Sequence, residues 1–66
     1  MISGKVDYVE FMSDGNAFAI IGKTKRALRD AGNSREDIEN YIVQMMGGDY
    51  DNVLSMALAV LEFEDE

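Results

Sequence analysis

Apolar residues recur at two different spacings along the chain, and the change of spacing divides it into elements. Residues 5–12 (KVDYVEFM) are rich in β-branched and aromatic side chains, which favours a strand, although apolar groups fall on both of its faces. From residue 17 onward the spacing becomes helical. Three segments then carry an apolar residue every three or four positions, and they predict helices over 17–31, 35–46 and 50–59.

Residues suited to turns and caps lie at the boundaries of these segments. Asn16, Ser34 and Asp49 are suited to N-caps, because their side-chain oxygens can accept hydrogen bonds from backbone N–H groups of the first helical turn. Gly32 suits the left-handed conformation that ends many helices, and Gly47-Gly48 ends the second helix. Local sequence therefore predicts where the helices begin and where the first two end.

The last apolar segment permits two structures. Residues 60–64 (VLEFE) alternate between apolar and acidic side chains, which predicts a strand, whereas the alternative continues the third helix into a frayed acidic tail. We favour the strand, because a lone strand over residues 5–12 would have no partner for its backbone N–H and C=O groups. The sequence thus predicts one α+β domain, residues 1–66, with a three-helix layer and a short two-stranded sheet in the order β-α-α-α-β.

Size and composition make binding a better expectation than catalysis. The chain has 66 residues and contains neither histidine nor cysteine, so it has no near-neutral proton shuttle, no thiol nucleophile and no Cys/His metal site. Asp49 and Asp51 form a carboxylate pair, but cap and first-turn positions explain both residues structurally. We therefore expect no enzymatic activity, no cofactor and no metal.

The charge of the chain is strongly negative and unevenly distributed. Thirteen acidic residues against six basic ones give a formal net charge of −7, which disfavours binding to nucleic acid or to an anionic membrane and fits a protein partner with a basic groove. A solubilising surface is the alternative interpretation. The candidate acidic contacts lie in the second predicted helix and at the C-terminal end: Glu36, Asp37, Glu39, Glu62, Glu64 and Asp65.

Four of the six basic residues lie within residues 23–29 of the first predicted helix. Lys25 and Arg29 fall on one flank of that helix, and we take them as candidate contacts to an acidic partner or a phosphate. The alternative is a solvated helix face whose charges compensate the acidic remainder of the chain.

The third predicted helix has an apolar stripe wider than half its circumference, so it is either central or faces a partner as well as the core. We expect a homodimer with Leu54, Leu58 and Leu61 in its interface, because a second copy would offset a small core. Met46 lies off the stripe of the second predicted helix, where it either fills a gap in the core or adapts to a partner.

No targeting or membrane segment is recognisable in the sequence. The longest apolar run, residues 56–61, is far below the roughly 18 residues that a spanning helix needs. Residues 1–6 lack the apolar segment of a signal peptide. We therefore expect a cytoplasmic protein without membrane contact.

Two patterns resemble known families. Residues 15–22 (GNAFAIIG), followed by 26–29 (RALR) and 48–54 (GDYDNVL), resemble small uncharacterised proteins that are common in phages, prophages and bacteria. This resemblance spans roughly residues 5–64, implies a phage or mobile-element origin, and implies no activity. Separately, residues 45–47 (MMG) before a capped helix are similar to the loop of ubiquitin-associated domains, although those domains usually place an aromatic residue directly after Met-Gly.

Taken together, these features predict a small acidic protein that is not an enzyme and acts by binding another protein. The alternative is a DNA mimic, whose acids would occupy the basic groove of a host nucleic-acid-binding or defence protein of the restriction or CRISPR type. Direct nucleic-acid binding through Lys23, Lys25, Arg26 and Arg29 is a third class. Strong salt dependence and competition with nucleic acid would distinguish the mimic from a binder with an apolar interface.

Overall fold

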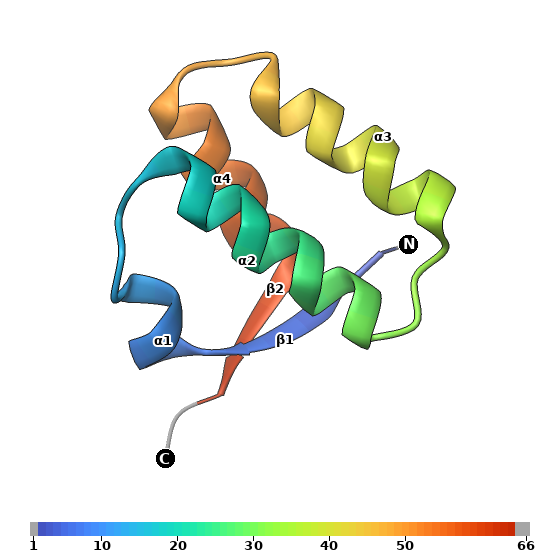
Figure 1. Cartoon of the computed structure of the whole chain (residues 1–66), viewed down its shortest axis with the longest axis horizontal. Coiled ribbons are helices and arrows are strands. Elements are labelled where there is room, and N and C mark those ends of the chain that lie inside the picture. Colours follow the sequence, from blue (N-terminus) through green and yellow to red (C-terminus); the bar gives the residue numbers. More distant parts are fainter. Residues whose placement is uncertain (1, 65–66) are drawn as a thin grey trace.

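Two short strands that are distant in sequence form one small parallel sheet, and helices pack against it (Figure 1). The computed structural model describes residues 2–64, and it confirms the predicted α+β class. In chain order the elements are β1 (Gly4–Asp7), α1 (Tyr8–Met12), α2 (Ala17–Asp30), α3 (Arg35–Met46), α4 (Tyr50–Val60) and β2 (Leu61–Glu64). The final segment is therefore a strand, as favoured, and the part of the chain that is described holds four helices instead of three.

Helix α1 corrects the prediction of a strand over residues 5–12. The strand ends at Asp7, whose side chain accepts a hydrogen bond of 2.9 Å from the backbone N–H of Glu10 and so caps a helical turn. Within α1 only Phe11 is buried, and its ring meets that of Phe63 edge to face with centroids 5.2 Å apart. Of the apolar residues that fell on both faces of the predicted strand, Tyr8, Val9 and Phe11 thus belong to a short helix, and Val6 belongs to β1.

The other helix boundaries follow the local signals. Asn16, Ser34 and Asp49 each accept a hydrogen bond from a first-turn backbone N–H, at 2.8, 3.1 and 2.9 Å. Gly32 has a φ of 88°, in the left-handed region, and follows the C-cap of α2. The predicted N-caps and the left-handed glycine are therefore confirmed.

The sheet joins β1 and β2 in parallel register, with Gly4 opposite Leu61 and Asp7 opposite Glu64. Alternate residues of both strands are buried or half-buried, while Lys5, Asp7, Glu62 and Glu64 are exposed on the other face. Gly4 permits close contact with the helix layer, because a Cβ atom at this position would lie 2.9 Å from the backbone of Ala27 in α2. Helix α2 consequently packs directly on β1.

A single core lies between the helices and the inner face of the sheet. Its largest fully buried side chains are Phe11, Leu28, Met45 and Thr24, which come from α1, α2 and α3. The hydroxyl group of Thr24 donates to the carbonyl of Ile20 at 2.8 Å, so its burial leaves no unpaired polar atom. Within residues 2–64 no helix has both the length and the apolar character needed to cross a bilayer.

Candidate functional site

Three large apolar side chains from separate helices are exposed around one shallow groove. Phe18 in the first turn of α2 is 76% exposed, Met46 at the end of α3 is 57% exposed, and Tyr50 at the start of α4 is 44% exposed. All three line a groove of about 220 Å³ whose floor includes Ile21 and Val53. We call Phe18, Met46 and Tyr50 the apolar patch.

Local hydrogen bonds hold the segments that carry the apolar patch. The side-chain amide of Asn52 donates to the carbonyls of Gln44 and Met45, both at 3.2 Å, and ties the start of α4 to the end of α3. The hydroxyl group of Tyr50 donates to the carbonyl of Gly15 and ties α4 to the turn before α2. The apolar patch is therefore arranged in the free chain, which lowers the entropic cost of binding a partner.

The charged residues near the apolar patch are acidic. Asp49 lines the groove, exposed Asp51 follows Tyr50 in sequence, and no lysine or arginine lines this groove. The surroundings of the patch thus complement a partner surface that carries basic groups around an apolar centre.

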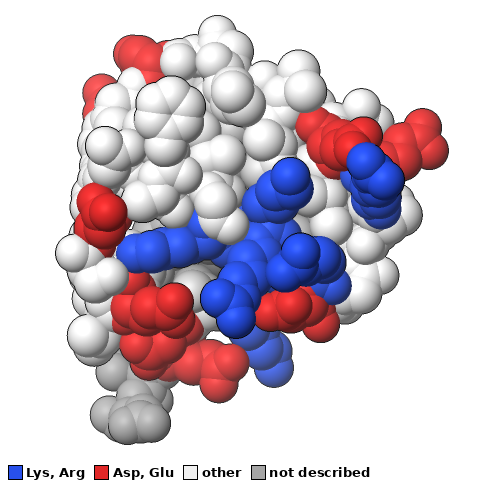
Figure 2. Space-filling model, in the orientation of Figure 1, with Lys and Arg blue, Asp and Glu red and all other residues white. Residues whose placement is uncertain are grey.

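A second and larger groove, of about 570 Å³, lies between one flank of α2 and the strand β1, and we call it the α2–β1 groove. Charged side chains of both signs line it. The basic ones are Lys5, Lys23 and Arg26, and the acidic ones are Asp7, Glu10, Asp30 and Glu64. Figure 2 shows most of the basic side chains of this face gathered in one area, with acidic side chains beside and among them, and another basic side chain apart from them next to acids.

The basic residues predicted as a cluster have different environments. Lys23 donates to the backbone carbonyl of Glu10 at 2.7 Å and to the hydroxyl of Ser13 at 3.1 Å, so its charge caps the C-terminal end of α1. By contrast, Lys25 and Arg29, the predicted contacts, are exposed and form no ion pair within residues 2–64. Lys23 therefore has a structural role, whereas Lys25 and Arg29 remain free for a partner.

The predicted acidic contacts lie on two separate elements. Glu36 and Asp37 occupy the first turn of α3, and Glu39 pairs with Arg35 at 3.0 Å. Glu62 and Glu64 are exposed on the outer face of β2, and Asp65 lies outside the described residues. Favourable first-turn positions and one local ion pair thus account for the α3 acids.

The residues predicted for a dimer interface differ in exposure. Leu61 is only 6% exposed and belongs to the core of this chain, and Leu54 is half-buried against that core. Leu58 is 54% exposed. Of the three, Leu58 alone presents most of its side chain to a second copy.

Sequence reasoning singled out Met46 but missed Phe18 as a surface residue. The signal was present, because Phe18 lies off the apolar stripe of the predicted helix over residues 17–31. Within the described part of the chain, no cluster of acidic side chains is arranged to hold a metal ion. The arrangement of these surfaces suits recognition of another molecule.

No protein-family model, curated protein or solved structure matches the chain.

Proposed function

We propose that this chain is a non-enzymatic protein of phage type that acts by binding another protein, with the apolar patch as its docking surface. The observation that carries the proposal is the joint exposure of Phe18, Met46 and Tyr50 around one groove. Single exposed apolar residues are normal, but a group of them marks an interaction site, and aromatic and methionine side chains are enriched in interface cores. The resemblance of residues 15–22 to small phage proteins supports the proposed phage origin. We propose that the protein acts in the cytoplasm of the host.

The partner is proposed to be a protein with an apolar anchor surrounded by basic side chains. Such a surface would place apolar atoms against Phe18 and basic groups near Asp49 and Asp51. The net charge of −7 would accelerate the encounter of the two proteins at low ionic strength.

Affinity capture from a bacterial lysate, followed by measurement of the affinity for the recovered protein, tests the proposal. We expect Phe18→Ala to weaken binding by about 2 kcal/mol, or roughly thirtyfold, because a buried aromatic residue at an interface centre dominates the binding energy. Val9→Ala is the matched control, since Val9 in α1 is 75% exposed and lies outside the groove. Equal affinity of the Phe18→Ala variant and the control would contradict the proposal.

The same measurement distinguishes the DNA mimic. A mimic would bind a nucleic-acid-binding protein through its acids, lose affinity steeply with added salt and be displaced by DNA. Its affinity would not depend on Phe18. If binding weakens steeply with salt, is displaced by DNA and does not depend on Phe18, the acidic surface and not the apolar patch is the functional site.

A further inference from the structure

Strand β1 has one edge that is not paired within the described chain. Its partner on the other edge is β2, and apart from this pairing Lys5 and Val6 make no backbone–backbone hydrogen bond within residues 2–64. Alternate residues of a strand direct their N–H and C=O groups to opposite edges, so the free edge presents unpaired donors and acceptors. A sheet of only two short strands is also marginal, and a third strand would extend it.

The α2–β1 groove leaves room beside this free edge. Lys5, Val6 and Asp7 form one side of the groove, and the flank of α2 forms the other. Gly22 lies on that flank in the middle of α2, where glycine destabilises a helix, and a Cβ atom there would meet nothing within 4 Å. No contact inside the chain explains the missing side chain, whereas close approach of a bound backbone does.

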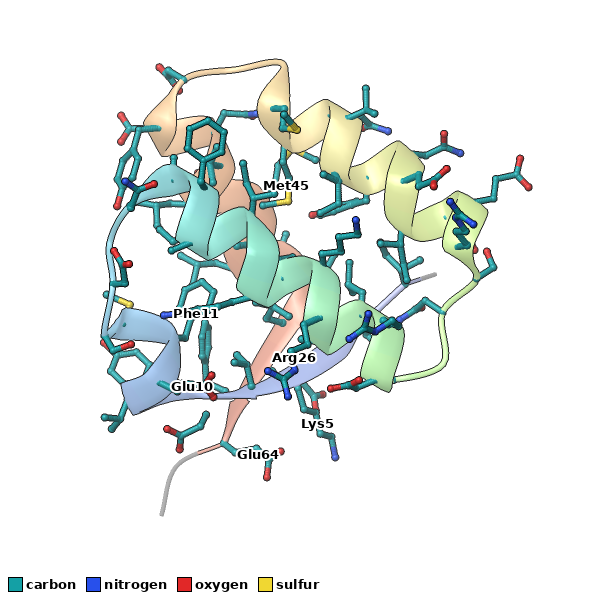
Figure 3. All side chains as sticks on the ribbon, in the orientation of Figure 1. Lys5, Glu10, Phe11, Arg26, Met45 and Glu64 are labelled. Atoms are coloured by element: carbon teal, nitrogen blue, oxygen red, sulfur yellow. The ribbon has the colours of Figure 1, made fainter. Side chains whose placement is uncertain are left out.

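Charges of both signs occur at each end of the groove, since Lys23 donates to the carbonyl of Glu10 and Arg26 pairs with Asp30 at 3.9 Å. In Figure 3, Glu10 and Glu64 lie on the side of α1, while Arg26 and Lys5 lie on the opposite side. On β1 itself, Asp7 has acidic Glu64 as its register partner, and Lys5 carries the opposite charge two positions away. A bound strand would therefore need a basic side chain next to Asp7 and an acidic one next to Lys5.

We infer that the α2–β1 groove binds an extended segment of a partner protein, which adds to β1 as an antiparallel third strand. Read from its N-terminal end, this segment carries a basic, an apolar and an acidic residue opposite Asp7, Val6 and Lys5. Main-chain hydrogen bonds to β1 supply affinity, and the order of the charges supplies specificity. The antiparallel direction follows from the more stable hydrogen-bond pattern of antiparallel pairs.

Residues 5–7 of a second copy, Lys-Val-Asp, have the inferred order of charges, but the helix that covers them makes a second copy a poorer occupant than a partner segment. Because α2 packs on β1, pairing of two β1 strands would bring the two α2 helices side by side. The helices would then take up the space beside the paired strands. A segment without its own covering helix avoids this crowding.

Two synthetic peptides of identical composition test the inference. Acetyl-Thr-Lys-Val-Asp-Thr-amide carries the inferred order of charges, and acetyl-Thr-Asp-Val-Lys-Thr-amide carries the reverse order. NMR titration of the full chain should show shifts of the β1 amide signals with the first peptide and roughly tenfold weaker binding of the second. Gly22→Leu should abolish binding of the first peptide by filling the groove, whereas Ala59→Leu at an exposed position of α4 should not.

Several results would overturn the inference. These are equal binding of the two peptides, shifts that avoid β1, undiminished binding by the Gly22→Leu variant, and a concentration-dependent dimer that Gly22→Leu dissociates. The Phe18→Ala variant should bind the first peptide as the original chain does, so this test is independent of the function proposed for the apolar patch.

Discussion

Gly22 and Gly32 lie ten positions apart in environments that make opposite demands on a side chain. Gly22 is an interior residue of α2 with open space around its Cα atom. Gly32 has a φ of 88° and closes the helix, since the backbone N–H of Asn33 donates to the carbonyl of Leu28 at 3.2 Å. The same substitution should therefore change stability in opposite directions at these two positions.

We expect Gly22→Ala to raise the free energy of unfolding by about 0.5–1 kcal/mol, because alanine loses less backbone entropy in a helix. Gly32→Ala should lower the free energy of unfolding by about 1–2 kcal/mol, because an L-residue is strained in the left-handed region. Urea denaturation of both variants measures the two changes. A change of the same sign in both would contradict the assigned conformations.

The phenol of Tyr41 links stability to alkaline pH. Burial raises the pKa of Tyr41 above its ordinary value of 10.0, and its hydroxyl donates to the backbone carbonyl of Met56. Because the folded pKa exceeds the unfolded one, this contribution to stability is complete below pH 10 and is lost as the pH rises through the folded pKa.

Stability measured against pH should therefore decline above about pH 10 in the original chain and less steeply in Tyr41→Phe. The substitution should also cost about 1 kcal/mol at neutral pH, since the hydrogen bond to Met56 is lost. If the free energy of unfolding falls equally with pH in both proteins above pH 10, burial does not raise the pKa of Tyr41.

Helix α1 is too short to be stable by itself, and Lys23 of α2 forms hydrogen bonds with its C-terminal end. Lys23 contacts the carbonyls of Glu10 and Phe11 at 2.7 and 3.4 Å and also the hydroxyl of Ser13. These groups lie at the C-terminal end of α1, where a cation is favourable. These hydrogen bonds of Lys23 thus connect α1 with α2 across the turn over residues 13–16.

We expect Lys23→Ala to lower the free energy of unfolding by about 1 kcal/mol and to speed hydrogen exchange in α1. Lys25→Ala is the matched control, because Lys25 is exposed and forms no ion pair within residues 2–64, and it should change stability by less than about 0.5 kcal/mol. Equal effects of the two substitutions would exclude the capping role of Lys23.

The strand predicted over residues 5–12, which forms β1 and α1 instead, shows where local sequence stops determining an element. Valine and aromatic residues favour strands by propensity, and α1 contains three of them, Tyr8, Val9 and Phe11. They form a helix nevertheless, because Asp7 caps the first turn and Phe11 is buried in the core. The caps of α2, α3 and α4 were predictable, since each depends on a hydrogen bond to a residue two or three positions away. The pairing of the first and last strands was predicted, but its parallel direction and its register depend on residues far apart in the sequence, and no local pattern encodes them.

The apolar patch illustrates the same limit for the functional surface. Met46 and Phe18 can each be recognised in sequence as apolar residues off a helix stripe. Their meeting with Tyr50 around one groove is a property of how α2, α3 and α4 pack. Sequence alone therefore supplies the candidates, and the tertiary structure supplies the site.

For the molecule as a whole, homodimerisation through α4 stays a prediction. Of the residues predicted for the dimer interface, Leu58 is exposed, whereas Leu61 is buried in the core of this chain. Sedimentation over a range of concentrations should show a dimer that Leu58→Glu dissociates, because a buried unpaired carboxylate is unfavourable in an apolar interface. A monomer at all concentrations, with the fold intact, would refute the dimer.

The pairing of position 4 with position 61 also governs the order of events during protein synthesis. The segment of β1 is synthesised before α2, α3 and α4, but it cannot pair until residues 61–64 have also been synthesised. Helices α2 to α4 can associate earlier through contacts that are closer in sequence. A released chain that lacks residues 61–64 should therefore form contacts among its helices, while β1 has no partner strand and is accessible to chaperones and proteases.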